Sequence, residues 1–370
     1  MTSLATAGDA TAERMINRRK FLAASGATLA STSLASCGGP GKLRDEDVPR
    51  SDFDARSTAE EVTADIDLAG RLAVVTGCTS GIGFETMRVL AMRGAYVVGT
   101  SRSLERAEEA CGKVIGTTTP VALDLADPES VVKCATAILS LRSPIDMLIC
   151  NAGHRGGGNE HQLINGIEKH FAINHLGHFL LVNRLLDRLY VAGPSRIVVV
   201  ASRTAYLDAP AKGIRFDDLA WTGDYDDATA YAHSKLANVL FANELGRRLG
   251  NTAMTANSLH PGVINTEIDR NMSPLSQFGF GLLTSISGKT IEQGAATSCF
   301  VATSPLLKFI TSRYFEDNNA VIVGGQHHLT DVPMAYRLWE LSEELLADYL
   351  VAPEPPGAKE KSDKQESDEQ

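Results

Sequence analysis

Short apolar runs with strand character alternate with helical segments through most of this chain, and this alternation restricts the fold more than any other feature of the sequence. The apolar runs are rich in Val, Ile and Leu, as in strands that are buried on both faces. Helices between such strands allow the strands to run parallel. The sequence therefore predicts one α/β domain built on a doubly wound parallel sheet, with helices on both faces.

The predicted elements follow one another without internal repeats beyond this strand–helix unit. Strands are expected at 71–76, 95–100, 120–123, 145–150, 196–200 and 254–259. Helices are expected at 84–93, 104–113, 127–141 and 166–190, and from Tyr231 onward. A last strand is expected at either 313–315 or 320–323, and the pattern does not distinguish between these two ranges.

The N-terminal segment, 1–37, is predicted to be a targeting signal rather than part of the fold. Arg18 and Arg19 precede a weakly apolar run, in a pattern that resembles a bacterial twin-arginine export signal. The stretch 34–38 resembles a lipoprotein cleavage box, in which Cys37 would become the lipidated N-terminus and the only membrane anchor. Alternatively, Cys37 is incidental to a cleavage region of small residues. We expect an exported, periplasmic or membrane-anchored protein, with the cytoplasm as the alternative.

Polar segments flank the predicted domain. Residues 38–66 are rich in Gly, Pro, Ser and charged residues without a period, which indicates a linker. The tail at 351–370 is charged and almost without apolar residues, which indicates disorder. The folded domain is therefore expected at 67–350, and the chain starts at either Met1 or Met15.

The charge balance argues against nucleic acid as a partner. The formal net charge is -10 and the pI is about 5.4, whereas nucleic-acid binding relies on clustered Lys and Arg that neutralise phosphates. The six cysteines include no C-x-x-C pair. The five cysteines after Cys37 are therefore expected to be unpaired, and no metal site is predicted.

Tyr231 and Lys235 open an amphipathic helical run and form the candidate reactive pair. Positions i and i+4 share one face of a helix, so the phenol and the ammonium point into the same space. A nearby cation favours the phenolate and so lowers the pKa of a phenol from its reference value of about 10. Tyr231 is therefore a candidate proton donor and acceptor, with an ordinary surface pair as the alternative.

A glycine-rich loop follows the first predicted strand and opens the first predicted helix. Glycines at this point allow a tight turn and the close approach of a pyrophosphate, whose charge is favoured at a helix N-terminus. The candidate binding residues of the loop are Thr76, Gly77, Ser80, Gly81, Ile82 and Gly83.

The loop spacing, T-G-x-x-x-G-I-G, together with the Y-x-x-x-K pair, resembles the short-chain dehydrogenase/reductase family, which has a single Rossmann-like domain. Further matches follow in the family's order over about residues 67 to 345: Asp124, Asn151-Ala152-Gly153, Asn174, Ser202 and Pro261-Gly262. Within the family, the chain looks most like the retinol dehydrogenase-like branch. The stretches that carry this likeness are 174–180, 231–238, 259–263, 292–296 and 338–342.

The resemblance implies hydride transfer between a nicotinamide dinucleotide and a small-molecule alcohol or carbonyl substrate. Tyr231 would be the general acid/base, and Lys235 would lower its pKa and bind the nicotinamide ribose. Ser202 would hold the substrate oxygen. Asn174 would anchor a water that connects Lys235 to solvent. Two departures from the family pattern, Cys78 and Cys150, remove no catalytic group.

The resemblance also implies a cofactor, and it favours NADP over NAD. Relatives that prefer NAD usually carry an acidic residue after the second strand, where this chain has Ser101 and Arg102. An Arg can pair with a 2′-phosphate that an Asp would repel, whereas the alternative is a solvent-facing Arg. Besides the loop, Tyr231 and Lys235, the implied cofactor-binding residues are Ser101, Arg102, Asp124, Leu125, Asn151, Ala152, Gly153, Pro261, Gly262, Val263 and Thr266.

The segment 271–289 falls where relatives have a substrate lid, and its apolar residues favour a lipophilic substrate; a helix packed on the core is the alternative. A nucleotide-binding sensor or scaffold on the same fold, and a protochlorophyllide reductase-like enzyme, are the competing functions. Retention of Tyr231, Lys235, Ser202 and Asn174 favours the dehydrogenase. Because relatives often form homodimers or homotetramers, the resemblance implies such an assembly.

Overall fold

The computed structural model describes residues 41–156, 161–264 and 288–350, hereafter the described residues. Several predictions lie outside them: the signal at 1–37 with Cys37, the tail at 351–370, Thr266 and most of the lid at 271–289. Within the described ranges, no helix is both long enough and apolar enough to cross a membrane.

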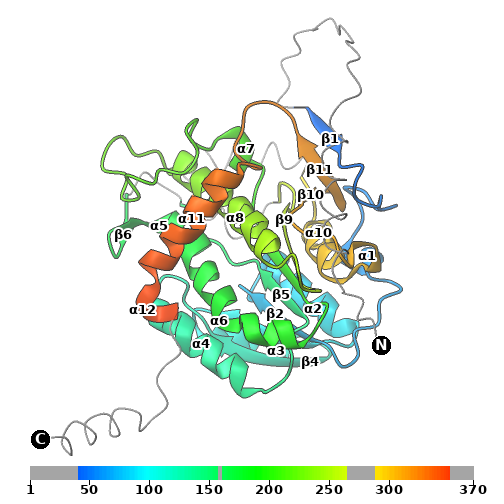
Figure 1. Cartoon of the computed structure of the whole chain (residues 1–370). Helices are drawn as coiled ribbons and strands as arrows, with labels where there is room; N and C mark the ends of the chain where they lie inside the picture. The colour runs from blue at the N-terminus through cyan, green and yellow to red at the C-terminus, as the bar shows by residue number, and fades with distance from the viewer. Residues whose placement is uncertain (1–40, 157–160, 265–287, 351–370) are drawn as a thin grey trace, which may run out of the picture. The chain divides into compact units, whose positions relative to one another are not determined.

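A nine-stranded sheet forms the centre of the fold, and seven neighbouring strands in it run parallel (Figure 1). In order across the sheet, these are β4 (Thr117–Ala122), β3 (Tyr96–Ser101), β2 (Leu72–Thr76), β5 (Met147–Cys150), β8 (Arg196–Val200), β9 (Thr255–His260) and β10 (Tyr314–Glu316). The chain moves outward from β2 to β4 and then returns to the other side of β2 at β5. The predicted doubly wound parallel sheet is confirmed, and its reversal point lies between β2 and β5.

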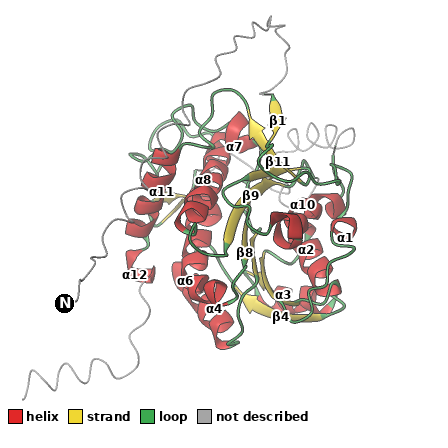
Figure 2. Cartoon of the chain, turned by 45° about the vertical axis from the view of Figure 1, so that its right-hand side comes forward, coloured by secondary structure: helices red, strands yellow, loops and turns green. Residues whose placement is uncertain are grey.

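Helices cover both faces of the sheet (Figure 2), and the strand side chains alternate between two apolar clusters. Val74 and Leu148 belong to one cluster, and their chain neighbours Val75 and Ile149 belong to the other. The first cluster is covered by α4 (Pro128–Ser140), α6 (Gly177–Val191), α8 (Asp227–Arg248) and α11 (Val332–Leu345). The second is covered by α1 (Ala59–Val62), α2 (Gly81–Met92), α3 (Leu104–Gly112) and α10 (Ile291–Thr303). This double burial explains why the strands are continuous apolar runs.

An aromatic group joins α11 to the helices beneath it. The ring of Trp339 lies 4.9 Å from that of Phe179 on α6 and 5.9 Å from that of Phe241 on α8, measured between centroids. All three side chains are nearly or fully buried, and burying a large apolar side chain stabilises a fold by roughly 1.5–3 kcal/mol. This contact holds α11, with the short α12 (Ala347–Leu350) after it, against α6 and α8.

The helix predicted at 166–190 begins later than expected. Its first residues form a small hairpin of β6 (Leu163–Ile164) and β7 (Ile167–Glu168), and helical structure starts at α5 (Lys169–Phe171). Asn165 and Gly166 have φ of 51° and 79°, and such an Asn-Gly pair favours a two-residue hairpin turn over a helix. A π-helical segment (Ala172–Leu176) then leads into α6.

The segment predicted as a linker at 38–66 is part of the fold from Gly41 onward. Strand β1 (Lys42–Arg44) pairs antiparallel with β11 (Asn319–Val323) at the sheet edge. Helix α1 starts with a capping box between Thr58 and Glu61, which satisfies amides at its first turn, and it buries Val62. Because the segment is mostly polar, its few apolar residues did not indicate that it is attached to the domain.

Both ranges proposed for the last strand are strands. Residues 314–316 form β10 and residues 319–323 form β11, joined as an antiparallel hairpin. Asp317 and Asn318 in its turn have φ of 50° and 63°, the left-handed conformation that Asp and Asn tolerate. The two alternatives were therefore two arms of one hairpin.

Candidate functional site

A cleft of about 1210 Å³ opens at the carboxyl ends of the parallel strands, where the strand order reverses. Its walls come from the loops that follow β2, β3, β4, β5, β8 and β9, together with the start of α8. Open α/β sheets bind ligands at this reversal point, so this cleft is the candidate functional site.

The glycine-rich loop forms one wall, and two of its glycines disfavour a side chain for different reasons. Gly77 has φ of +72°, and a Cβ on Gly83 would lie 2.1 Å from the Gly77 carbonyl oxygen and 2.4 Å from Asn151 Nδ2. Helix α2 begins at Gly81, and the side chain of Ser80 does not cap it. Uncapped amides at a helix N-terminus and close backbone approach are the features that bind a pyrophosphate, so the loop fits a dinucleotide.

Thr76 acts behind this loop rather than in the cleft wall. Its Oγ1 accepts the amides of Asn151 and Ala152, both at 2.9 Å, and Asn151 Nδ2 donates to the Thr76 carbonyl at 2.8 Å. The same hydroxyl lies 3.0 Å from Nε2 of His178, whose Nδ1 donates to the Asn174 carbonyl. Burial lowers the pKa of His178 to about 4, so its neutral ring accepts from Thr76. The loop is thereby joined to the end of β5.

Tyr231 and Lys235 lie one turn apart on α8, and both line the cleft. Lys235 Nζ donates to the carbonyl of Val200 at 3.1 Å and lies 5.6 Å from the centroid of the Tyr231 ring. Burial lowers the pKa of Lys235 to about 8, because the protein replaces the water that would solvate the ammonium. The i, i+4 geometry expected from the sequence therefore places both groups at one surface of the cleft.

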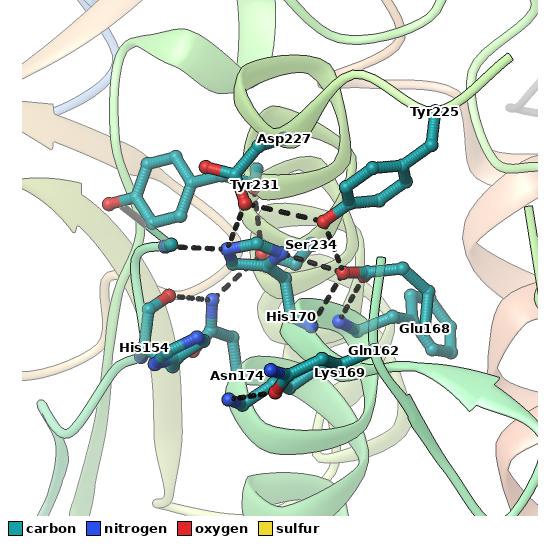
Figure 3. A network of polar contacts seen from close by, with 12 residues as sticks. His154, Gln162, Glu168, Lys169, His170, Asn174, Tyr225, Asp227, Tyr231 and Ser234 are labelled. Atoms are coloured by element: carbon teal, nitrogen blue, oxygen red, sulfur yellow. Dashed lines mark hydrogen bonds and ion pairs between the residues drawn. The ribbon is translucent and has the colours of Figure 1, made fainter. Parts of the chain in front are cut away.

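Ser202 lines the cleft just after β8, and its Oγ accepts the amide of Thr204 at 3.3 Å. Asn174 is fully buried in the π-helical segment and does not line the cleft. Its side chain accepts the His154 amide at 2.7 Å, and donates to the His154 carbonyl and to Ser234 Oγ, both at 2.9 Å (Figure 3). Asn174 therefore positions the loop after β5, and its role in a water relay stays a prediction.

Most of the predicted cofactor-binding residues are brought together in the cleft. Those that line it are Gly77, Ser80, Gly81, Ile82, Gly83, Ser101, Arg102, Asp124, Leu125, Asn151, Ala152, Gly153, Tyr231, Lys235, Pro261, Gly262 and Val263. The cleft also contains a buried acceptor, Thr100 Oγ1, that has no hydrogen-bond partner among the described residues. A buried hydroxyl without a hydrogen-bond partner destabilises a fold unless a ligand supplies that partner. The unpaired hydroxyl of Thr100 is therefore consistent with a polar ligand beside β3.

Some lining residues were missed by the sequence analysis, among them Arg106, Arg155 and His260. Arg106 lies on α3, whereas Arg102 precedes the N-cap residue Ser103, so no helical spacing relates the two arginines. Neither guanidinium forms an ion pair within the described part of the chain. Arg155 follows the Asn151-Ala152-Gly153 motif in an irregular loop, and no periodic signal marks it.

The cysteines that depart from the family pattern are packing groups. Cys78 and Cys150 are fully buried, and burial raises the pKa of the Cys150 thiol above its ordinary range. Within the described ranges, Cys78, Cys111, Cys134, Cys150 and Cys299 form no disulfide, as predicted. In the same ranges, no three His, Cys, Asp or Glu side chains gather as metal ligands.

The cleft, its glycine loop and the Tyr–Lys pair define a nucleotide-binding α/β protein with a candidate proton-transfer group. Residues 71–213 match the family described as short chain dehydrogenase. The chain therefore belongs to the short-chain dehydrogenase family and is an oxidoreductase of that family.

Individual relatives cover most of the chain. Short-chain dehydrogenase TIC 32 A, chloroplastic, from Brassica napus is 38% identical over 312 residues, spanning 80% of this chain and 95% of that protein. Retinol dehydrogenase 11 from Homo sapiens is 38% identical over 290 residues, spanning 77% of this chain and 88% of that protein. A solved structure of an uncharacterized protein from Mycobacterium Paratuberculosis is 32% identical, with a TM-score of 0.61, over 76% of this chain and 96% of that one.

Proposed function

We propose that this protein is an NADP-dependent alcohol dehydrogenase or carbonyl reductase that acts on a lipophilic substrate. One observation carries the proposal: Tyr231, Lys235 and Ser202 line the same cleft as the glycine-rich loop. A proton-transfer group, a cation and a hydroxyl donor therefore face the space beside the nucleotide cradle. The chain's family membership supports the same reaction class.

Each of the three side chains has a separate role in the reaction at the substrate oxygen. Bound nicotinamide supplies or accepts the hydride. Tyr231 donates its phenolic proton to the carbonyl oxygen in reduction and removes the alcohol proton in oxidation. Ser202 donates a hydrogen bond to the same oxygen and stabilises the charge that develops there. The Lys235 ammonium favours the phenolate form of Tyr231.

The arginines beside β3 support NADP rather than NAD. Arg102 and Arg106 both line the cleft next to Ser101, and α3 carries only Glu105 as an acidic residue in its first turn. A 2′-phosphate placed there would meet two guanidinium groups, which bind phosphate oxygens in pairs.

A sensor or scaffold has no need of Tyr231 or Lys235, so their presence in the cleft favours an enzyme.

Apolar side chains on the substrate side support a lipophilic substrate. Leu207, Val263 and Ile264 line the same cleft as Ser202, and a parallel bridge joins Ile264 to Lys289, the last residue of the segment predicted as a lid. One of the relatives described above is named retinol dehydrogenase. These features favour an alkyl or isoprenoid alcohol, or the corresponding aldehyde.

A homologous series of aldehydes, from acetaldehyde to decanal, tests the substrate class. We expect kcat/KM with NADPH to rise by up to about fourfold per added methylene until the apolar surface is filled, because each buried methylene contributes about 0.8 kcal/mol. The measurement is NADPH consumption in the steady state, with NADH as the comparison. A flat series, or a preference for acetaldehyde, would contradict a lipophilic substrate.

Nucleotide affinity should depend on pH through Lys235. In the free protein this ammonium has a pKa of about 8, and a bound anionic dinucleotide favours the charged form. Above pH 8, binding must therefore take up a proton, and the affinity for NADP is expected to fall as pH rises, by at most about tenfold per pH unit. Fluorescence titration from neutral to alkaline pH measures the slope. Lys235→Arg stays charged over this range, so an equal slope in that variant would exclude Lys235 as the origin.

A further inference from the structure

Two cations lie at nearly equal distances from the ring of Tyr231. The guanidinium carbon of Arg155 is 5.2 Å from the ring centroid, and Lys235 Nζ is 5.6 Å from it. A cation within about 6 Å of an aromatic ring is attracted to it, and the attraction increases when the ring carries the negative charge of a phenolate. The proposed function assigns this role to Lys235 alone.

Arg155 is held over the ring by its two chain neighbours. On one side, the amide and the carbonyl of His154 both bond to the Asn174 side chain, at 2.7 and 2.9 Å. On the other side, the amide of Gly156 donates to His170 Nε2 at 2.8 Å. Both anchors, Asn174 and His170, come from the buried segment before α6 (Figure 3), so the backbone is fixed on both sides of Arg155.

The bond from Gly156 determines which form of His170 is present. Because Nε2 accepts the amide, the ring proton lies on Nδ1, where it donates to Glu168 Oε1 at 2.6 Å. Glu168 is fully buried and also accepts the amides of His170 and Phe171. Although burial opposes it, these hydrogen bonds hold the pKa of Glu168 below its ordinary value. The ring of His170 in turn meets that of Tyr231 edge-on, 5.9 Å between centroids.

Glycine at position 156 allows close contact with a third neighbour. A Cβ there would lie 1.9 Å from Asp227 Oδ1, and Asp227 stands one turn before Tyr231 on α8. The same carboxylate lies 3.7 Å from His170 Nε2, and burial raises its pKa. The Arg155 loop is therefore packed directly against the helix that carries Tyr231.

Charged and titratable groups from several elements surround Tyr231, and together they determine the balance between its phenol and phenolate forms. From α8 come Lys235 and Asp227, and from α5 comes His170 with Glu168 behind it. Arg203 comes from the start of α7 (Thr204–Leu207), and Asp208, whose carboxyl interacts with Arg155, comes from its end. The cations that contact the phenol ring itself within the described residues are Arg155 and Lys235.

We propose that Arg155 is a second cation that stabilises the phenolate of Tyr231, and that Glu168 and His170 are positioning residues that hold Arg155 in place. The proposal rests on the function proposed for Tyr231. In alcohol oxidation the phenolate is the active form, so the rate rises with pH through a midpoint. Removing a cation from the ring moves that midpoint to higher pH.

The test compares the pH profile of kcat/KM for alcohol oxidation in three variants. Arg155→Gln is expected to raise the midpoint by about 0.5 to 1 pH unit, so that the rate below the midpoint falls about three- to tenfold and recovers at alkaline pH. Arg155→Lys should restore most of the wild-type profile. His170→Phe keeps a ring beside Tyr231 but loses the acceptor for Gly156, so it should shift the midpoint in the same direction by a smaller amount.

Lys212→Met is the matched control, because Lys212 is an exposed cation outside the cleft. A second readout does not depend on turnover. It is the ultraviolet titration of the Tyr231 phenolate in nucleotide-bound Arg155→Gln, obtained by subtracting the titration of the same variant that also carries Tyr231→Phe. An unchanged midpoint with only a raised KM would overturn the proposal and assign Arg155 to substrate binding. Full activity in Tyr231→Phe alone would instead overturn the proposed function.

Discussion

Replacing Tyr231 by Phe is expected to lower kcat by about 10²- to 10⁴-fold, the range over which a positioned general acid or base contributes to rate. The substitution removes one oxygen and keeps the ring, so the contacts of the ring with His170 and Arg155 can persist. Nucleotide affinity should stay within about threefold, because the glycine loop and the arginines beside β3 are untouched. The variant therefore separates proton transfer from binding.

Single-turnover reduction of an aldehyde by bound NADPH measures this loss without interference from product release. The matched control is Tyr190→Phe, since Tyr190 is 64% exposed on α6 and lies outside the cleft. That variant should keep wild-type rates. A Tyr231→Phe protein that binds NADP and retains more than about a tenth of the wild-type rate would show that another group transfers the proton.

The sequence could predict the sheet and much of the cleft because both depend on local patterns. Continuous apolar strands such as the one around Val74 are buried on both faces wherever they occur. Lys235 lies one helical turn after Tyr231 on any helix, so their shared face required no tertiary information. The glycine loop was recognised from its local spacing, and the structure agrees with it: Gly77 has φ of +72° and Gly83 leaves no room for a Cβ.

What the sequence could not predict depends on contacts between distant segments. Strand β1 exists because Leu43 pairs with Ile322, which lies at the other end of the chain, and three residues carry too little pattern to show this. The side chain of Asn174 holds His154, a contact set by the irregular loop after β5 that no local pattern shows. The position of Arg155 follows from that same loop.

Replacing Arg102 by Ser is expected to weaken NADPH binding by about 10- to 100-fold while leaving NADH binding within about threefold. A charge-assisted hydrogen bond contributes about 1.5–3 kcal/mol, and each 1.4 kcal/mol corresponds to a factor of ten. Arg102 lines the cleft after β3 and forms no ion pair within the described residues, so its guanidinium is available to a 2′-phosphate. NADH has no such phosphate, so the loss should be selective.

Titration of protein fluorescence with each nucleotide measures the two dissociation constants directly. Lys113→Ser is the matched control: Lys113 caps the end of α3, is 61% exposed, and pairs with Glu109 rather than lining the cleft. Because both variants remove one positive charge near the same helix, any general electrostatic effect on an anionic ligand should appear in both. Adding Arg106→Ser should weaken NADPH binding further, since Arg106 also lines the cleft. Equal losses for NADPH and NADH in Arg102→Ser would place this arginine at a phosphate that both nucleotides share, and NADP preference would then lose its structural basis.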